Sequence, residues 1–289
     1  MKAAFRGEGI IAAVLVILAV LLAAVYLHFQ NTSMQVSHYK ISSGRVPDGF
    51  DGCKIAQISD FHNTGSAKLT EKLISEIKAE NPDIIVITGD LIDSRNTDVK
   101  TVLQFIQEIS DVAPIYYVNG NHESRVIDEY AELKEGLENL GVKVLENEAV
   151  NLEKNGDEVV LMGISDLNFS ETAQYIGEAQ AADDQLSMLS EKTKYQFTIL
   201  LSHRSELIEI YAANNMDLVF SGHAHGGQIR LPFIGPVIAP NQGLFPKYTS
   251  GVYSEEGTQM VVSRGIGNSL FPFRVNNRPE LVVAELSAE

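Results

Sequence analysis

The sequence predicts an α/β fold, a four-layer αββα sandwich of two mixed β-sheets flanked by helices, preceded by an N-terminal transmembrane helix. Three observations favour this fold. Residues 10–27 form an uncharged apolar run. From residue 51 onward, short apolar strands alternate with amphipathic helices, which is typical of parallel sheets. Residues 148–164 and 251–263 instead resemble hairpins, so two kinds of β pattern in one domain indicate two packed sheets.

The N-terminal run has 18 residues without a charge or a strongly polar group, about enough to cross a bilayer core as a helix. A cleaved signal has a shorter apolar region of about 7–15 residues and a small-residue cleavage site, which is not evident after this run. We therefore expect residues 1–30 to be a retained anchor rather than a cleaved signal. Lys2 and Arg6 precede the run, so the expected localisation is the cell membrane, with a single span and the later residues outside the cytoplasm.

Residues 31–50 predict a short linker and a first strand, and residues 51–289 predict the main domain. The central strand candidates are short, rich in β-branched and aromatic residues, and apolar on both faces, as strands covered on both sides are. They are residues 53–59, 83–89, 113–119, 196–202 and 217–222. Residues 281–287 predict one more strand, and the hairpins are expected to turn at Asn155-Gly156 and near Glu256-Gly257.

Three amphipathic helices are expected between the earlier strands. Each has apolar residues at helical spacing along one stripe. The stripes are Leu69, Leu73, Ile74 and Ile77; Val99, Val102, Leu103, Ile106 and Ile109; and a third within residues 125–140. Asn81-Pro82 ends the first helix and Gly141 ends the third. The alternation of strands and helices implies parallel strands with right-handed crossovers.

Composition narrows the classes of function. The chain has 289 residues and is 45% hydrophobic, enough for one large or two small domains. Its net charge of −16 argues against binding to a nucleic-acid backbone, which needs a basic surface. The single cysteine, Cys53, excludes an intrachain disulfide and a thiolate metal cluster, and it does not indicate the compartment.

Polar side chains follow all five central strands at the point where each is expected to end. They are Asp60 and His62; Asp90; Asn121 and His122; His203; and His223 and His225. Ligands bind at the carboxyl ends of strands in open α/β sheets, so we expect these side chains to share one cleft. Alternatively, the carboxylates cap the following helices. Capping explains Asp and Asn, but not five of the chain's seven histidines at these positions.

This set of carboxylates, imidazoles and one amide, without thiolate, suits divalent Mn, Fe or Zn. Two such ions about 3.5–4 Å apart clamp the oxygens of a phosphate in two-metal enzymes. A carboxylate with two oxygens is the best bridge between them. The donor set therefore indicates a site for divalent metal ions, and a pair of them could clamp a phosphate.

Five motifs carry a resemblance to a known family. They are Asp60-x-His62, Gly89-Asp90, Gly120-Asn121-His122-Glu123, His203 and Gly222-His223-Ala224-His225. In order and spacing they resemble the motifs of the calcineurin-like metallophosphoesterases, over residues 51–289. The segments GHAHGGQIRLP, SRGIGNS and FRVNNRPE resemble more narrowly the membrane-associated bacterial branch. Some relatives there cleave phosphodiesters, and one related activity hydrolyses a UDP-linked diacylglucosamine lipid.

The resemblance implies a role for each motif residue. The ligands of the first metal would be Asp60, His62 and His225. The ligands of the second would be Asn121, His203 and His223. Asp90 would bridge the two ions, and His122 would face the substrate as a general acid. Many relatives follow the fourth-motif histidine with x-Pro, whereas this chain has Arg204-Ser205, so the shape of that loop is left open.

The implied protein is a membrane-anchored dinuclear-metal phosphoesterase, in which a metal-bound hydroxide attacks a phosphodiester of a lipid or envelope component. The alternatives are a phosphomonoesterase, a UDP-diacylglucosamine-type pyrophosphatase with the same metal site, and a non-catalytic binding module, in which the ligands should be eroded. Arg264 and Arg274 are candidate substrate-binding residues, although such arginines often pair with carboxylates inside a domain. The apolar residues 232–248 predict either a lipid-facing wall or a packed loop.

Overall fold

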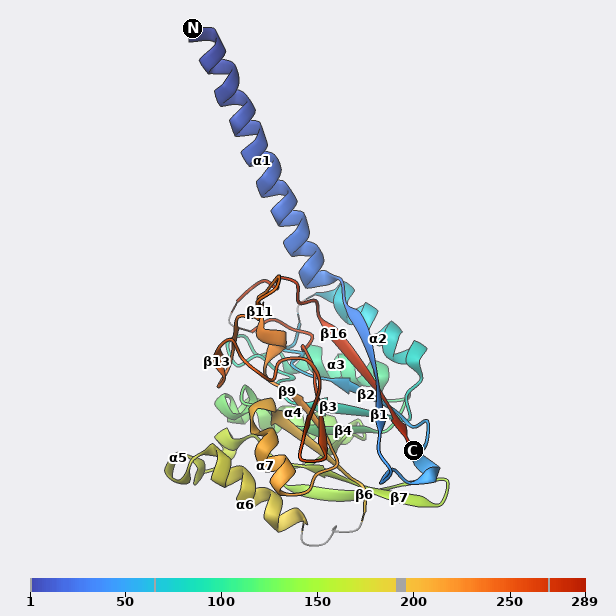
Figure 1. The fold of residues 1–289 in the computed structure, drawn as a ribbon. Coiled ribbons are helices and arrows are strands. Elements are labelled where there is room, and N and C mark those ends of the chain that lie inside the picture. Colours follow the sequence, from blue (N-terminus) through green and yellow to red (C-terminus); the bar gives the residue numbers. More distant parts are fainter. Residues whose placement is uncertain (1, 65, 191–195, 270) are drawn as a thin grey trace.

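Helix α1 (Lys2–Thr32) projects away from the rest of the chain in the computed structural model, which describes residues 2–64, 66–190, 196–269 and 271–289 (Figure 1). Its part Gly9–Thr32 is long and apolar enough to cross a membrane, with a hydropathy of 3.2, and the domain does not bury its most apolar stretch. The helix continues two residues past the expected anchor. It leads directly into β1 (Gln35–Ser42), which is the strand expected in the linker.

The first sheet has the strand order β1-β16-β2-β3-β4-β5. Its parallel part consists of β2 (Lys54–Ile58), β3 (Ile84–Thr88), β4 (Ile115–Val118) and β5 (Lys143–Val144). The last strand, β16 (Glu280–Ser287), returns between β1 and β2, parallel to β1 and antiparallel to β2. The sheet is therefore mixed, and the final strand of the chain lies inside it rather than at an edge.

The second sheet has the strand order β14-β15-β9-β8-β7-β6. Its strands are β6 (Glu148–Lys154), β7 (Asp157–Gly163), β8 (Thr198–Arg204), β9 (Leu218–Gly222), β14 (Gly251–Glu255) and β15 (Thr258–Val262). The two outer pairs are the expected antiparallel hairpins, and the inner pairs β7–β8, β8–β9 and β9–β15 are parallel.

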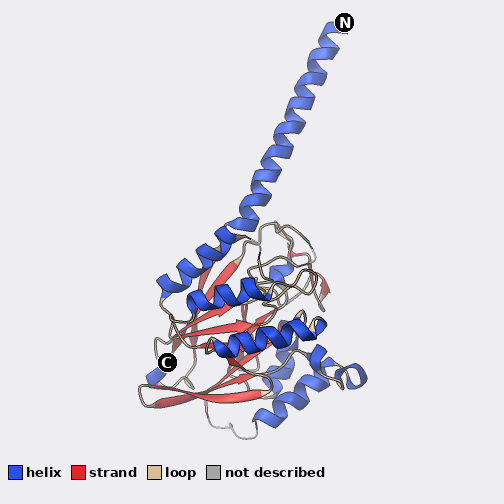
Figure 2. Cartoon of the chain, turned by 180° about the vertical axis from the view of Figure 1, so that it is seen from behind, coloured by secondary structure: helices blue, strands red, loops and turns tan. Residues whose placement is uncertain are grey.

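Three apolar clusters show the four layers. The helices are α2 (Ala67–Glu80), α3 (Val99–Ile109), α4 (Ile127–Asn139), α5 (Ala173–Ile176), α6 (Glu178–Ser190) and α7 (Ile208–Ala213). Side chains of α2–α4 pack on the first sheet, those of α5–α7 pack on the second, and a third cluster fills the space between the sheets. Figure 2 views the molecule from the opposite side to Figure 1, and helices cover the strands there. The predicted αββα sandwich is confirmed.

Helix α2 illustrates how the local sequence sets an element. The Ser66 side chain accepts a hydrogen bond from the Leu69 amide and caps the first turn. Leu69, Leu73 and Ile77 recur every four residues and are buried against the sheet. Asn81 then takes a left-handed conformation at φ 47°, which ends the helix before Pro82.

The structure divides the five central strands between the two predicted sheets: β2, β3 and β4 lie in the first sheet, and β8 and β9 lie in the second. Helices α5–α7 and two small hairpins were not expected. The hairpin strands are β10 (Arg230–Leu231) with β11 (Gly235–Pro236), and β12 (Ile238–Ala239) with β13 (Gly243–Leu244).

Candidate metal centre and catalytic pocket

All eight motif side chains lie at the carboxyl ends of the five central strands, as expected. Those from the first sheet follow β2, β3 and β4, and those from the second follow or end β8 and β9. Their side chains are buried, and each is at most 7% exposed. His203 lies within β8, where the pairing with β9 shifts register between Leu201 and Arg204. Such a bulge redirects a side chain out of the regular alternation of the strand.

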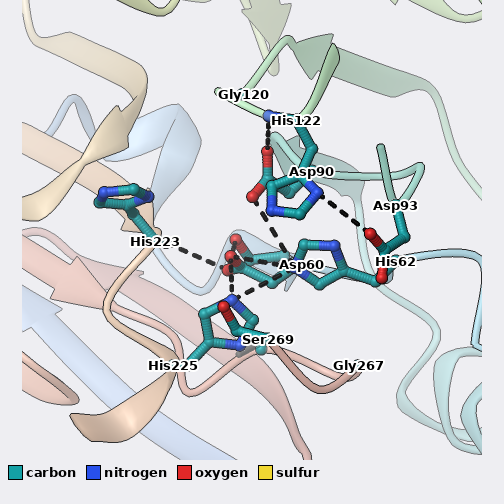
Figure 3. Close-up of polar contacts among 12 residues, drawn as sticks. Asp60, His62, Asp90, Asp93, Gly120, His122, His223, His225, Gly267 and Ser269 are labelled. Atoms are coloured by element: carbon teal, nitrogen blue, oxygen red, sulfur yellow. Dashed lines mark hydrogen bonds and ion pairs between the residues drawn. The ribbon is translucent and has the colours of Figure 1, made fainter. Parts of the chain in front are cut away.

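The first group of converging ligand atoms consists of Asp60, His62, Asp90 and His225. His225 Nε2 lies 3.1 Å from Asp60 Oδ1 and 3.2 Å from His62 Nε2. His62 Nε2 also lies 3.7 Å from Asp90 Oδ2. Figure 3 shows these side chains pointing toward one another. Two carboxylates and two imidazoles aimed at one point form a donor set that fits a divalent cation.

The second group consists of Asp90, His203 and His223. His203 Nε2 lies 3.3 Å from Asp90 Oδ2 and 3.1 Å from His223 Nδ1. The amide oxygen of Asn121 lies 3.2 Å from the same nitrogen, so it belongs to this group as well. Asp90 is thus the side chain that the two groups share.

The pKa shifts of His62, His223 and Asp90 favour metal binding. Burial lowers the pKa of His62 to about 3, and burial together with the His203 charge holds the pKa of His223 well below its ordinary value. Burial alone would raise the pKa of Asp90, but the charge of His203 holds it well below the usual range. Neutral imidazole and ionised carboxylate are the forms that bind a metal ion. Burial opposes the charge on His203, yet the Asp90 carboxylate raises its pKa to about 10, so positive charge is favoured between these two groups.

Five of the eight residues have a left-handed backbone, with φ between 46° and 66°. They are Asp60, His62, Asp90, His223 and His225. Asp and His adopt this region more readily than most residues, but each such residue still costs on the order of 1–3 kcal/mol. Backbone strain of this kind clusters at functional sites, where the surrounding structure holds it in place.

Two glycines let the loops approach closely. A Cβ on Gly120 would lie 2.3 Å from Asp90 Oδ1, and a Cβ on Gly222 would lie 1.9 Å from Ser59 Oγ and 2.5 Å from Asp60 Oδ2. No other residue fits at these positions without moving a carboxylate of the site. The glycines of the third and fifth motifs are therefore part of the site geometry rather than flexible spacers.

His122 lies beside the first group, with its ring centroid 4.5 Å from that of His62. Its Nδ1 accepts a hydrogen bond from the Ser94 amide at 3.1 Å, so in the neutral ring the proton is on Nε2. Burial lowers the pKa of His122, while Asp93 Oδ1 lies 3.4 Å from Nδ1 and stabilises the protonated ring. His62, Asp93 and His122 also converge as a third group of potential ligand atoms.

Glu123 is a site residue whose role sequence reasoning missed, although it stands in the third motif. Its buried carboxyl group, whose pKa is raised to about 8 by burial and by the charge of Asp90, accepts the backbone amides of Gly120 at 2.8 Å, Asp90 at 3.0 Å and Ile92 at 3.2 Å. Asp90 Oδ1 in turn accepts the His122 amide at 2.8 Å. Glu123 therefore ties the loop after β3 to the loop after β4.

Arg204 and Ser205 follow His203 where many relatives have x-Pro, and His203 still lies among the ligand atoms of the second group. Its buried guanidinium donates to both oxygens of Asp166, at 2.7 and 2.9 Å, and to Glu178 at 3.1 Å. This two-pronged pair holds the end of β8 to the segment before α6. The side chain is therefore a structural link between the second sheet and its outer helices.

The structure does not bring Arg264 and Arg274 to the pocket. Arg274 is fully buried, and its guanidinium donates to the backbone carbonyls of Arg264, Gly265 and Gly267. Arg264 Nε lies 3.6 Å from Glu280 Oε1, within the domain. The substrate-binding role expected for these two arginines is not supported, because their groups face carbonyls and a carboxylate of the domain itself.

A pocket of about 180 Å³ opens beside the motif residues. Its lining is Asp90, Asn121, His122, Arg125, Asn168, Glu178, Arg204, His223, His225, Pro240, Asn241 and Ser269. Arg125 is exposed at this pocket, and among the described residues its side chain has no hydrogen bond or ion pair. It is a cation that sequence reasoning missed. Its position two residues after Glu123 was the available signal.

The comparisons with known proteins agree with this site. The family described as calcineurin-like phosphoesterase matches residues 53–227, well over half of the chain. An uncharacterized metallophosphoesterase of Bacillus subtilis, YkuE, is 31% identical over 88% of this chain and 86% of its own length. The phosphodiesterase YaeI of Escherichia coli is 27% identical over 81% of this chain and 82% of its own.

A solved structure supports the fold alone. TT1561 of Thermus thermophilus superposes with a TM-score of 0.51 at 16% identity, over 74% of this chain and 90% of that one. The family match, the Bacillus relative and the converging carboxylates and imidazoles together lead to one conclusion. The chain belongs to the calcineurin-like metallophosphoesterase superfamily and is a metal-dependent phosphoesterase.

Proposed function

We propose that this protein is a membrane-anchored phosphodiesterase that uses two divalent metal ions, Mn, Fe or Zn, to hydrolyse a phosphodiester of a lipid or envelope component. One observation carries the proposal: two groups of buried ligand atoms converge separately and share Asp90. The similarity to a phosphodiesterase of Escherichia coli supports the diester.

Each group would hold one ion. Asp60, His62 and His225 would bind the first. Asn121, His203 and His223 would bind the second, and Asp90 would contact both. When bound, the ions would neutralise the phosphate and activate water as the nucleophile. The chain's own contribution is to hold seven ligand side chains in a buried and strained frame, in which neutral imidazole is favoured at His62 and His223 and ionised carboxylate at Asp90.

His122 would act as the general acid. The acid would be the protonated ring, whose positive charge is stabilised by Asp93 Oδ1 at 3.4 Å from Nδ1. Its Nε2 proton would pass to the leaving oxygen in the pocket that the ring lines, and the neutral ring left behind would then take up a proton from water. We also propose that the exposed Arg125 contacts a phosphate oxygen of the substrate, because its charge at the pocket is not neutralised by a described side chain.

We further propose that residues 1–30 form the anchor, residues 31–50 the linker and first strand, and residues 51–289 the catalytic domain. The unburied apolar helix supports the anchor, and Lys2 and Arg6 before it favour an extracytoplasmic domain. Protease added to intact spheroplasts should digest the domain. Protection until lysis would contradict this orientation.

The full-length protein purified in detergent tests the proposed reaction. Metal content and hydrolysis of bis(p-nitrophenyl) phosphate, p-nitrophenyl phosphate and a UDP-linked lipid are measured side by side, before and after chelation. We expect chelation to abolish hydrolysis, Mn or Fe to restore it at least as well as Zn, and the diester to be preferred. Full activity without metal would refute the metal centre. A preference for the monoester or the UDP-linked lipid would favour one of the alternative enzymes, and absence of both metal and activity would favour a binding module.

A further inference from the structure

The segment of residues 229–248 carries a group of exposed apolar side chains. They are Leu231, Phe233, Ile234, Leu244 and Phe245, and they are between 42% and 110% exposed. We call these five residues the apolar rim. They lie on or beside the two small hairpins, β10–β11 and β12–β13. An exposed group of large apolar side chains marks an interaction surface more often than a solvated one.

Folding alone gives no reason for the two phenylalanines. Phe233 and Phe245 have left-handed backbone, with φ of 67° and 56°. A bulky residue in this region is an outlier that glycine or asparagine would relieve. Both rings are also largely exposed to solvent. Each position therefore combines two unfavourable features without burying the ring inside the domain.

The charge of this segment differs from that of the chain. Residues 229–248 contain no Asp or Glu and include Arg230 and Lys247, whereas the whole chain has a net charge of −16. An anionic lipid surface would repel most of this acidic protein, but it would attract the basic residues of this segment.

Contacts with α1 place the apolar rim near the expected membrane surface. Asn276 donates to the Arg230 carbonyl at 2.9 Å and accepts the Tyr26 hydroxyl at 2.7 Å. Tyr26 precedes Thr32, the last residue of α1, by six residues, so this contact lies roughly 9 Å back along the helix toward the membrane. Figure 1 shows β11 beside the base of α1. The first hairpin therefore lies at the level where an aromatic residue of α1 would meet the bilayer surface.

The same region reaches the metal centre. Asn277 links the end of α1 to the loop that carries His225. Its backbone amide donates to Gln30 Oε1 at 3.1 Å, and its side-chain amide donates to the His225 carbonyl at 2.7 Å. An apolar crevice of about 90 Å³, lined by Gln228, Ile238, Ala239, Pro240, Ser269 and Phe271, adjoins the catalytic pocket, and the two share Pro240 and Ser269. The apolar rim, the crevice and the pocket are thus neighbouring parts of one surface.

We propose that the apolar rim inserts into the surface of the membrane that α1 spans and so presents the catalytic pocket to a lipid-linked phosphate. This inference rests on the proposed anchor and deepens the proposed function, since it selects a lipid-linked substrate. Insertion would remove the exposed rings from water, and the basic residues would lie at the headgroups. Of the two expectations for residues 232–248, the exposure of Phe233 and Phe245 supports the lipid-facing wall rather than the packed loop.

The absence of tryptophan from the chain provides a direct test. The full-length Phe233→Trp protein is reconstituted into vesicles of phosphatidylcholine and phosphatidylglycerol, with part of the phosphatidylcholine brominated on its acyl chains. The control is Tyr175→Trp, because Tyr175 is 81% exposed on α5, at the end of the domain away from α1 (Figure 1). We expect blue-shifted emission from Trp at 233 and quenching by brominated chains severalfold stronger than in the control.

Two results would overturn the proposal. Quenching at position 233 by aqueous iodide as readily as in the control would show that the rim stays in water. Protection from both quenchers would show that protein, such as a second copy of the chain, covers it. Flotation of the protein with the vesicles tests the anchor separately, and chelator-sensitive hydrolysis of bis(p-nitrophenyl) phosphate by both variants tests the metal centre. Failure of the rim can therefore be distinguished from failure of the proposed function.

Discussion

The metal centre and the apolar rim both hold residues in left-handed backbone, but in opposite surroundings. At the metal centre the strained residues are buried, and their carboxylates and imidazoles point at one another. At the rim the strained Phe233 and Phe245 are exposed. The first region is held by buried hydrogen bonds such as those of three amides to Glu123, whereas the second consists of two short hairpins whose large apolar side chains are exposed.

The two regions therefore differ in whether their interaction partners lie within the chain or outside it. The metal centre has its partners within the chain, so changes there should alter metal binding and catalysis directly. The described residues leave the side chains of the rim largely exposed. Substitutions there should therefore leave the isolated protein almost unaffected and alter only its behaviour at a membrane. The following variants test this division, from the largest expected effect to the smallest.

Asp90→Asn should have the largest effect. The variant removes the charge shared by both ligand groups, so we expect loss of both ions and a fall in activity of at least about 10³-fold, since one preorganised electrostatic contact alone is worth about 10²–10³. Metal analysis and diester hydrolysis measure the two losses. Asp111→Asn, the same substitution at an exposed position, should change neither. Retention of one ion at full occupancy would contradict the shared role of Asp90.

His122→Ala should keep near-normal metal content and lose about 10²–10⁴-fold in rate, the usual contribution of a general acid. The loss should be smaller for a nitrophenolate leaving group, because that oxygen needs little protonation to depart. Two rates, on an alkyl and a nitrophenyl diester, measure the difference. If His122 were instead a ligand in the third group with His62 and Asp93, the variant would lose metal or lose both rates equally.

Glu123→Gln should have an intermediate effect. Its carboxylate accepts three backbone amides, and the amide of glutamine would face some of them with its own N–H groups. We expect metal affinity to fall about 10–100-fold, as for other groups that orient ligands. Titration of the chelated protein with Mn measures this affinity. An unchanged affinity with lowered thermal stability would show that Glu123 supports the fold but does not position Asp90.

Much of the metal centre could be predicted from the sequence, because its chemistry depends on residue types at strand ends. Five strands were recognisable by their apolar patterns, and each was followed by a carboxylate, amide or imidazole at the edge where the structure brings them together. The division of the strands between two sheets could not be predicted, since parallel strands look alike in either sheet. It did not affect the site, because both groups of strands present their carboxyl ends to the same cleft.

The arginines and the apolar segment could not be assigned in this way. Arg274 and Arg125 are the same residue type near motifs, but one is fully buried among carbonyls and the other is exposed at the pocket. That difference depends on how distant segments pack, and no local pattern records it. The same holds for residues 232–248, whose apolar composition fits both a packed loop and an exposed surface until the exposure of each side chain is known.

The smallest effect is expected from the double variant Phe233→Asn and Phe245→Asn. Asparagine tolerates the left-handed backbone better than phenylalanine, and removing an exposed ring leaves no cavity. Surface substitutions of this kind change stability by about 0.5 kcal/mol or less, or about 2 °C in melting temperature for a domain of this size. The melting temperature in detergent and the rate of hydrolysis of the soluble diester should therefore match those of the unmodified protein. The Asp90→Asn variant, in contrast, should lose the hydrolysis. A loss of several degrees would show that the two rings pack within the domain, and the distinction between a buried, self-sufficient metal centre and an exposed rim that requires a membrane would then fail.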